Sequence, residues 1–390
     1  MKNPPRPLKP YPGFPLTAHR NGQWCKKIRG KVFYFGPVAD WQTALATYQE
    51  QRDDLHAGRT PRARHGGRVD CLTLGEAMDR FLSVKKLAQE AGEIRGRTYN
   101  EYEATCDRIS DSLGSSRWLD NVDETDLAKL RADFAKGKNG TRGPGTVKGD
   151  VTRARMVFLY INEYLAEKPI RYRKALKAPS RKQLRAVANE RGERLFGAAE
   201  IRAMIRAASV QLRAMILLGI NCGFGNNDCG TLPLARLDLD AGWHDYWRPK
   251  THNPRRCPLW PETVKALREA IAARSEKIAT DATGLVFVTK YGNSWADTGD
   301  RNSPVSYEFR KLLKTLGIYR HRVTSFYTLR RTFETIGQTT KDQVAVDFIM
   351  GHIAPSNNMA AVYRQRVFDD QLRNVTNHVR AWLGGLVSIE

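Results

Sequence analysis

The hydrophobic positions near the N-terminus form two short runs that are rich in aromatic and β-branched residues. The runs flank Arg29-Gly30, and this arrangement predicts a β-hairpin with its turn at that pair. A helix is predicted to begin after Asp40, because the apolar residues that follow are spaced to share one helical face. We therefore expect a small hairpin-and-helix domain over residues 1–64.

Residues 72–168 show the apolar spacing of α-helices. Two patterns of Thr followed three residues later by Glu, starting at Thr73 and Thr98, predict capping boxes at the beginnings of two helices. A third helix is predicted to begin near Glu124 and a long fourth helix at Thr146. The pattern predicts a separate four-helix domain.

The rest of the chain has a mixed pattern. Residues 169–194 are dense in cations and short of apolar periodicity, so we expect a basic interdomain linker there. Residues 195–390 predict an α/β domain, with two helices in 200–218, short strands in 237–259, a strand at 285–289 and further helices from 305 onward. The predicted fold class is mainly α with small β elements.

Charge indicates what such a protein binds. The 390 residues carry 64 Lys and Arg against 41 Asp and Glu, a formal net charge of +23. So large a surplus repels itself in the folded state, and an acidic partner offsets that repulsion. Double-stranded DNA is the expected partner. The sequence shows no run of eighteen apolar residues and no signal peptide at its beginning, so we expect a cytoplasmic protein and no membrane partner.

The cysteines and the motif scan suggest no cofactor. No C-x-x-C pair, Cys/His cluster at zinc-ligand spacing or nucleotide-binding loop is visible. We interpret the cysteines as reduced thiols. They are Cys25, Cys71, Cys106, Cys222, Cys229 and Cys257.

Three short segments near the C-terminus carry candidate chemistry. They are Tyr327-Thr-Leu-Arg330-Arg331, then Met350-Gly-His352, then Ala-Ala-Val-Tyr363. A guanidinium suits a phosphate, because it donates two parallel hydrogen bonds to two oxygens. A tyrosine hydroxyl can attack a phosphodiester when fixed cations meet the charge that develops on its oxygens.

These segments resemble the active site of the tyrosine recombinases, the phage-integrase family, whose members include enzymes of mobile genetic elements. The resemblance implies DNA recombination through a 3′-phosphotyrosyl bond, with an arm-type domain, a core-binding domain and a catalytic domain. It implies roles for Tyr363 as nucleophile, Arg330 and His352 as donors to the phosphate, and Lys250 as general acid. Tyr327 stands where the family usually has histidine, and keeps one hydrogen-bond donor there.

One position departs from the family pattern. The family's first arginine follows a helix and a glycine, and here Gly225 takes its place, with Asp228 matching the acidic position. Removing one such donor typically costs roughly 10²–10³ in rate. Three alternatives are open: Arg331 or Arg255 supplies the charge, the enzyme is slow, or the protein binds DNA without cleaving it. A type IB topoisomerase shares the chemistry but not the N-terminal domain.

The remaining expectations concern contacts. The predicted helix at 367–383 either docks on a neighbouring copy, giving dimers to tetramers on DNA, or packs on its own domain. Several cations are expected to contact DNA in addition to the active site. They are Lys26, Lys27, Arg29, Lys31, Arg171, Arg173, Lys174, Arg255, Arg256 and Arg331.

Overall fold

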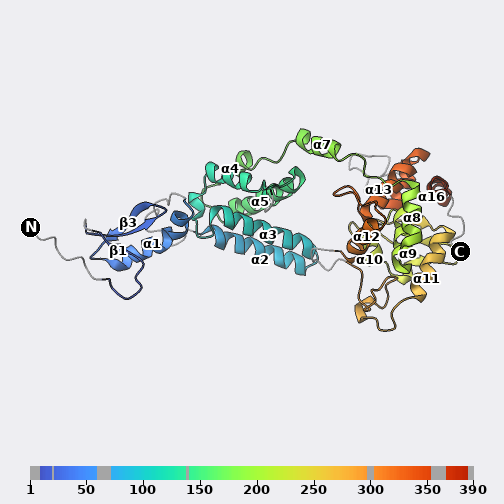
Figure 1. Ribbon diagram of the computed structural model, residues 1–390, viewed down its shortest axis with the longest axis horizontal. Coiled ribbons are helices and arrows are strands. Elements are labelled where there is room, and N and C mark those ends of the chain that lie inside the picture. The colour runs from blue at the N-terminus through green and yellow to red at the C-terminus, as the bar shows by residue number, and fades with distance from the viewer. Residues whose placement is uncertain are drawn as a thin grey trace, which may run out of the picture. The chain divides into compact units, whose positions relative to one another are not determined.

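The structure is a computed structural model. It is mainly helical with small sheets, which confirms the predicted fold class (Figure 1). The chain divides into two compact units, Met1–Arg185 and Ala186–Glu390. None of the helices in the described part of the chain is long and apolar enough to cross a membrane. The residues that the structure describes are 9–19, 22–58, 72–137, 140–296, 303–352 and 366–384.

The first unit begins with an antiparallel sheet and a helix that share one apolar core. The predicted turn is confirmed, since Arg29 and Gly30 have φ of 49° and 85°, the left-handed region that tight hairpin turns use. The predicted helix is also confirmed, and Asp40 accepts a hydrogen bond from the Thr43 N–H at 3.1 Å. A first strand, β1, was not predicted. The elements are β1 Thr17–Ala18, β2 Gln23–Ile28, β3 Lys31–Pro37 and α1 Trp41–His56.

A helical bundle with its own core follows in the same unit. The Thr73 capping box is confirmed, with the Thr73 N–H donating to Glu76 at 2.8 Å. The Thr98 capping box is wrong, because α3 begins at Gly96 and Thr98 lies inside it. Proline at the first position of α5 starts that helix two residues earlier than predicted. The helices are α2 Leu74–Glu90, α3 Gly96–Leu113, α4 Glu124–Asp133 and α5 Pro144–Tyr164. Two short strands, β4 Lys136–Gly137 and β5 Gly140–Thr141, and a 3₁₀ turn at Leu119–Asn121 complete this part.

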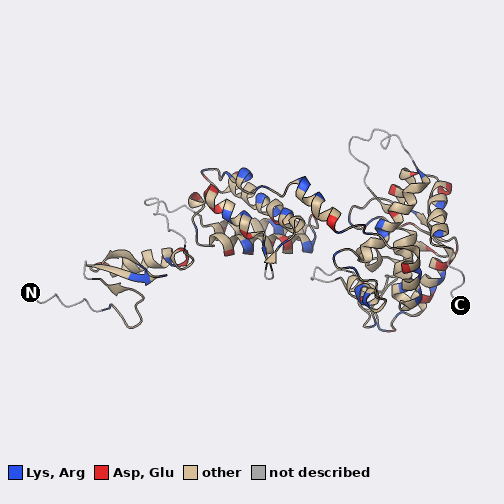
Figure 2. Cartoon of the chain, turned by 45° about the horizontal axis from the view of Figure 1, so that its top comes forward, with Lys and Arg blue, Asp and Glu red and all other residues tan. Residues whose placement is uncertain are grey.

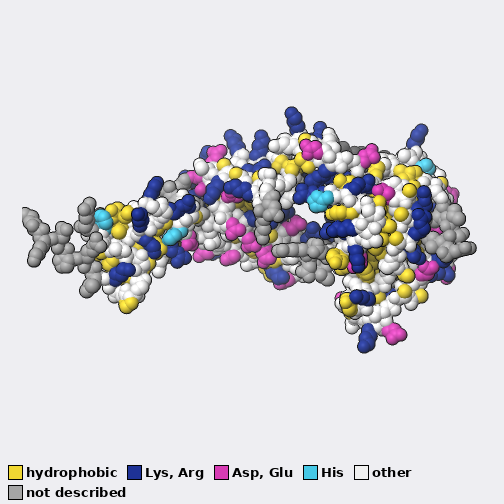
Figure 3. Space-filling view, in the orientation of Figure 1, with side chains coloured by type: hydrophobic (Ala, Val, Ile, Leu, Met, Phe, Trp, Pro, Cys, Tyr) yellow, Lys and Arg dark blue, Asp and Glu magenta, His cyan; other side chains and the backbone are white. Residues whose placement is uncertain are grey.

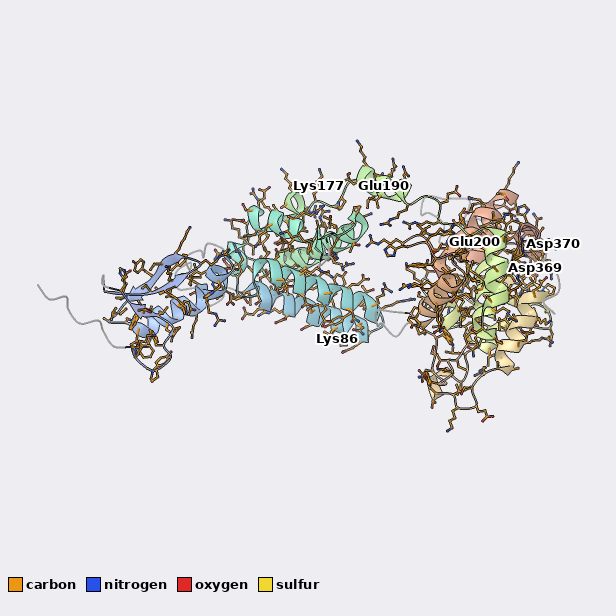
Figure 4. The ribbon with its side chains drawn as sticks, in the orientation of Figure 1. Lys86, Lys177, Glu190, Glu200, Asp369 and Asp370 are labelled. Atoms are coloured by element: carbon orange, nitrogen blue, oxygen red, sulfur yellow. The ribbon has the colours of Figure 1, made fainter. Side chains whose placement is uncertain are left out.

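The segment expected to be a linker is partly helical. It contains α6 Tyr172–Ala175 and α7 Arg181–Glu190, whose last residue is labelled in Figure 4. Ile170, Tyr172 and Leu176 are buried in the core of the bundle. Residues 170–176 therefore belong to the packed helical bundle and not to a linker.

The second unit has the largest core, formed by its helices around α9. The strand predicted at 285–289 is wrong, since Leu285 and Val288 make only isolated bridges. The elements are α8 Ala198–Ala207, α9 Val210–Asn221, α10 Asn226–Gly230, β6 Leu237–Asp238, β7 Trp243–His244, β8 Cys257–Pro258, α11 Pro261–Ala272, α12 Pro304–Thr315, α13 Phe326–Gly337, α14 Gln343–Met350 and α16 Asp369–Trp382, with 3₁₀ turns at Leu234–Arg236, Thr280–Ala282 and Gln338–Thr340.

The last described helix, α16, packs on its own domain. Leu372, Val375 and Leu383 are fully buried in the core of the second unit. The Trp260 Nε1–H donates to the Thr376 carbonyl at 3.0 Å, and Arg380 pairs with Glu262 at 2.6 Å. In the single chain α16 therefore packs on its own domain, and its docking on a neighbouring copy stays a prediction.

Candidate active site

Arg330 joins two of the three segments that the sequence singled out. Its side chain points from α13 into the protein and is 1% exposed. Its Nη1 donates to the Gly223 carbonyl and its Nη2 to the Met350 carbonyl at 2.7 Å. Burial, and then the nearby charge of Arg248, lower the pKa of Arg330. One guanidinium thus ties the turn after α9 to the end of α14, just before Gly351-His352.

His352 is positioned by the end of α14. Gly351 has φ of 62°, which suits glycine, and ends the helix. The His352 Nδ1 lies 3.1 Å from Asp347 Oδ1, and the side chain is 29% exposed. The carboxylate therefore orients the imidazole.

Gly351 is also a point of close approach. A Cβ there would lie 3.0 Å from Arg248 Cβ and 3.5 Å from Arg255 Cδ. The loop between β7 and β8 therefore packs directly against the segment that holds His352, and only a residue without a side chain fits at that contact.

The position of the missing arginine is next to Tyr327. Gly225 has φ of −97°, which any residue adopts, and its N–H donates to Asp228 Oδ2 at 2.6 Å. A Cβ at Gly225 would lie 3.3 Å from that Asp228 oxygen and 3.7 Å from Tyr327 Cδ2. The phenol ring of Tyr327 therefore stands beside the position, with 42% of the residue exposed.

Arg255 differs from its expected role as a surface contact to DNA. It is 2% exposed and its guanidinium lies over the Phe224 ring, 4.1 Å from the centroid. Its Nε donates to the Tyr246 carbonyl at 2.7 Å, and its Nη2 lies 3.3 Å from Asp228. Arg255 is inside the domain, with its charge balanced by Asp228.

Arg248 is the residue that the sequence reasoning missed. It is half-buried and contacts the Gly351 position, and its positive charge lowers the pKa of Arg330. Within the described residues, no acidic side chain pairs with it. The available signal was its place in Trp247-Arg248-Pro-Lys250, two residues before the candidate general acid.

The neighbours of Arg248 on this loop have different surroundings. Lys250 is exposed on the turn between β7 and β8, as expected for a hairpin lysine. Arg256 lies 3.2 Å from Asp245 and 3.4 Å from Asp369, and its guanidinium is over the Trp243 ring. Figure 4 shows Asp369 with Asp370 at the beginning of α16. Two carboxylates thus neutralise Arg256, the expected phosphate contact.

Arg331 lines a basic cavity of about 330 Å³, and its guanidinium also lies over the Tyr327 ring, 5.7 Å from the centroid. No acidic side chain in the described ranges pairs with the cavity's four arginines. Figure 3 shows Lys and Arg side chains at several places on the visible face of the second unit. The cavity's basic residues are Arg194, Arg310, Arg322 and Arg331, together with His321.

The other expected DNA contacts lie in the first unit, where Lys and Arg are spread over the helices and the hairpin (Figure 2). Lys26 is half-buried, with its ammonium 4.7 Å from the Tyr48 ring centroid. The remaining ones, namely Lys27, Arg29, Lys31, Arg171, Arg173 and Lys174, are exposed. Tyr363, the expected nucleophile, lies outside the described residues.

Comparison with solved structures gives the fold. A lambda integrase dimer bound to a COC′ core site is similar at a TM-score of 0.55 and 16% identity, over 93% of this chain and 98% of that one. A lambda integrase tetramer bound to a Holliday junction is similar at a TM-score of 0.55 and 15% identity, over 90% of this chain and 98% of that one. A Tn1549 transposon integrase in complex with a circular intermediate DNA is similar at a TM-score of 0.53 and 16% identity, over 78% of this chain and 99% of that one.

The chain therefore has the fold of DNA integrases. More closely, this is the fold of the tyrosine recombinases of the phage-integrase type. No protein-family model and no curated protein matches the sequence.

Proposed function

We propose that the protein is a site-specific recombinase that breaks and rejoins duplex DNA through a 3′-phosphotyrosyl intermediate. The fold supports this, and the observation that carries it is Arg330, which holds the Gly223 turn and the His352 segment together. Arg248 adds a cation at the same place, with no acidic partner among the residues that the structure describes. A basic site fixed by buried hydrogen bonds suits a phosphate that gains charge during reaction.

We assign to Arg248 the role of the family's first arginine, which is missing at position 225. Of the two candidates named from the sequence, Arg255 is neutralised by Asp228, and Arg331 lies on the far side of the Gly225 position, over the Tyr327 ring and along the basic cavity. Arg248 has no acidic partner among the described residues, and its charge already acts on Arg330. The first cation is thus supplied from the β7–β8 loop instead of the turn at Gly225.

The reaction then follows from the assigned roles. Tyr363 Oη gives up its proton to water and attacks the phosphorus, and the bond to the 5′-oxygen breaks. Lys250 gives a proton to that leaving oxygen. Arg248 and His352 donate to the non-bridging oxygens and Tyr327 adds a hydroxyl donor, while the buried Arg330 holds the His352 segment in place through its bonds to the Gly223 and Met350 carbonyls. Attack by another strand's 5′-hydroxyl on the phosphotyrosine rejoins the DNA and frees the tyrosine.

Duplex DNA and homo-oligomers are the proposed partners. The net charge of +23 supports the first, and the dimeric and tetrameric integrase complexes of similar fold support the second. The basic cavity of Arg194, Arg310, Arg322 and Arg331 is proposed to bind the DNA backbone, where each neutralised phosphate releases counterions.

The test is covalent capture. The full chain is incubated with a pool of nicked duplexes with random central sequences, and DNA that stays attached in denaturing detergent is sequenced. We expect adducts with the parent and none with Tyr363→Phe, at nearly unchanged DNA affinity. Tyr307→Phe, an exposed tyrosine of the same unit, is the matched control.

Two outcomes contradict the proposal. An adduct that persists in Tyr363→Phe excludes that nucleophile. A parent that binds DNA tightly and never forms an adduct supports the alternative, a DNA-binding protein on the same scaffold that does not cleave. Gly225 in the arginine position is the observation that favours this alternative.

A further inference from the structure

Three side chains that are distant in the sequence meet inside the second unit. They are Cys222 at the end of α9, His244 in β7 and Cys257 in β8, and each is 0% exposed. Their ligand atoms all lie within 4.8 Å of one another. His244 and Cys257 are directly paired across the two strands, so their side chains project from the same side of the sheet.

His244 supplies an independent observation. Its Nδ1 accepts only a long hydrogen bond, 3.3 Å from the Tyr246 N–H. Its Nε2 is buried and has no hydrogen-bond partner. A buried polar group left in this way costs roughly 1–3 kcal/mol, so a native protein normally satisfies it. With Nδ1 as the acceptor, Nε2 carries the ring proton and finds no acceptor, whereas the other tautomer would turn the Nε2 lone pair towards a metal ion beside the two thiols.

We propose that Cys222, His244 and Cys257 bind a structural Zn²⁺ ion. Two thiolates and one imidazole are ligands that zinc prefers. Sulfurs 2.3 Å from a tetrahedral zinc are about 3.7 Å apart, so the side chains need to draw together by on the order of 1 Å. This site is separate from the proposed cleavage chemistry and is independent of it.

Charge and protons balance at the site. Burial lowers the pKa of His244 well below its usual value, which keeps the imidazole neutral as a ligand must be. Burial raises the pKa of Cys257, so this thiol is protonated before the ion arrives and gives up its proton on binding. Two thiolates then cancel the two charges of the ion, which removes the cost of burying a net charge.

Two further changes accompany binding. Coordination through Nε2 moves the ring proton to Nδ1 and gives up the weak contact with Tyr246. Three protein ligands leave a fourth position. The carbonyl oxygens of Asn221 and Pro258, 3.7 and 3.4 Å from Cys257 Sγ, are the candidates for it.

The ion would have a structural task. His244 and Cys257 are the two ends of the loop 245–256, which carries Arg248 and Lys250. Cys222 precedes the turn that holds Gly225. A single ion would fasten the base of this loop to the end of α9 and so limit how far the loop moves.

The test begins with the full-length parent protein, expressed with zinc in the medium and purified without chelators. We expect stoichiometric zinc by elemental analysis, sulfur ligands in X-ray absorption, and the visible bands of thiolate-bound Co²⁺ after substitution. Removing the ion should speed proteolysis within residues 245–256. Parent protein that binds neither Zn²⁺ nor Co²⁺ after refolding, or binds Zn²⁺ without sulfur ligands, overturns the proposal. So does a stoichiometric ion of another element.

Variants locate the site. Cys222→Ser, Cys257→Ser and His244→Gln should each lose most of the bound zinc. Cys229→Ser is the matched control, because Cys229 is as deeply buried in the same unit but is not one of the three ligands. A Cys222→Ser protein that keeps stoichiometric zinc overturns the assignment. If a variant does not fold, the ligand spectrum of the parent decides alone.

Discussion

Tyr327 lies beside Gly225, and a Cβ added to the glycine would stand 3.7 Å from the Tyr327 ring. The two residues replace the histidine and the arginine of the tyrosine-recombinase pattern, and the structure brings these two departures together. An arginine at position 225 would have to pass both this ring and the Asp228 carboxylate that accepts the Gly225 N–H.

We therefore expect Gly225→Arg to slow single-turnover cleavage. The backbone allows the change, but the longer side chain displaces Tyr327 and brings a further cation towards Arg248. Gly225→Ala is the control, since its Cβ meets only ordinary contacts and the end of the Asp228 side chain. Adding Tyr327→His to Gly225→Arg should recover part of the rate. A Gly225→Arg protein faster than the parent would mean that the position is empty.

The second prediction concerns Arg248. Arg248→Ala should lower the rate of adduct formation by roughly 10²–10³, as loss of a preorganised donor does. Arg248→Lys should lower this rate by less, because lysine keeps the positive charge although it lacks the two parallel N–H donors of arginine. Unfolding of both variants should resemble that of the parent. An unchanged adduct rate in Arg248→Ala would remove Arg248 from the active site.

Arg255 is the contrasting residue. Arg255→Ala leaves Asp228 as a buried, unpaired charge, and breaking such a pair costs about 3–5 kcal/mol. We expect a large loss in the free energy of unfolding, measured with denaturant. A stable Arg255→Ala protein with weaker DNA binding would restore the surface role that the sequence suggested.

Local chemistry explains what the sequence predicts well. Thr73 with Glu76 satisfies the first N–H groups of α2 by itself, and Arg29-Gly30 fits the turn of its hairpin. Thr98 has the same pattern as Thr73 but lies inside α3. There Glu101 pairs instead with Arg153 of α5 at 3.0 Å. A pairing across two helices is not visible in a window of four residues.

The site shows the same limit. The sequence identifies Arg330 and His352 because they lie in motifs, and it places Lys250 on a hairpin. It does not identify Arg248, whose proposed role depends on a contact with Gly351, far along the chain. It also does not show Cys222, His244 and Cys257 as a cluster, because three separate elements bring them together.

The basic cavity gives a prediction on salt dependence. Changing Arg194, Arg310 or Arg322 to Ala should each reduce the slope of log affinity against log salt by about 1, because one phosphate contact is lost. Arg268→Ala is the control, since Arg268 is exposed and already paired with Asp240 at 2.6 Å. Fluorescence anisotropy over a salt series measures the slopes. If the three cavity variants have the same slope as the parent and the Arg268→Ala control, the cavity does not contact the DNA backbone.

The N-terminal hairpin is predicted to contact a separate DNA site. Deleting residues 1–64, or changing Lys27, Arg29 and Lys31 together to Ala, should remove one protected region from a footprint and leave the rest. The hairpin carries these cations on exposed positions, so their loss should not unfold it. A footprint that is identical for parent and variants would show that the hairpin does not contact DNA.

The packing of α16 on its own domain leads to the last prediction. Leu372 is fully buried against that domain, so Leu372→Ala should lower the free energy of unfolding of the isolated chain by about 2–5 kcal/mol. Asn374→Ala, on the exposed face of the same helix, should leave it unchanged. Denaturant unfolding at low protein concentration measures both, and sedimentation with DNA reports the assembly. If Leu372→Ala leaves unfolding unchanged and instead reduces assembly on DNA, then α16 docks on a neighbouring copy. The hydrogen bond from Trp260 to the Thr376 carbonyl and the ion pair of Arg380 with Glu262 favour the first result, because a helix that leaves its own domain would give up both.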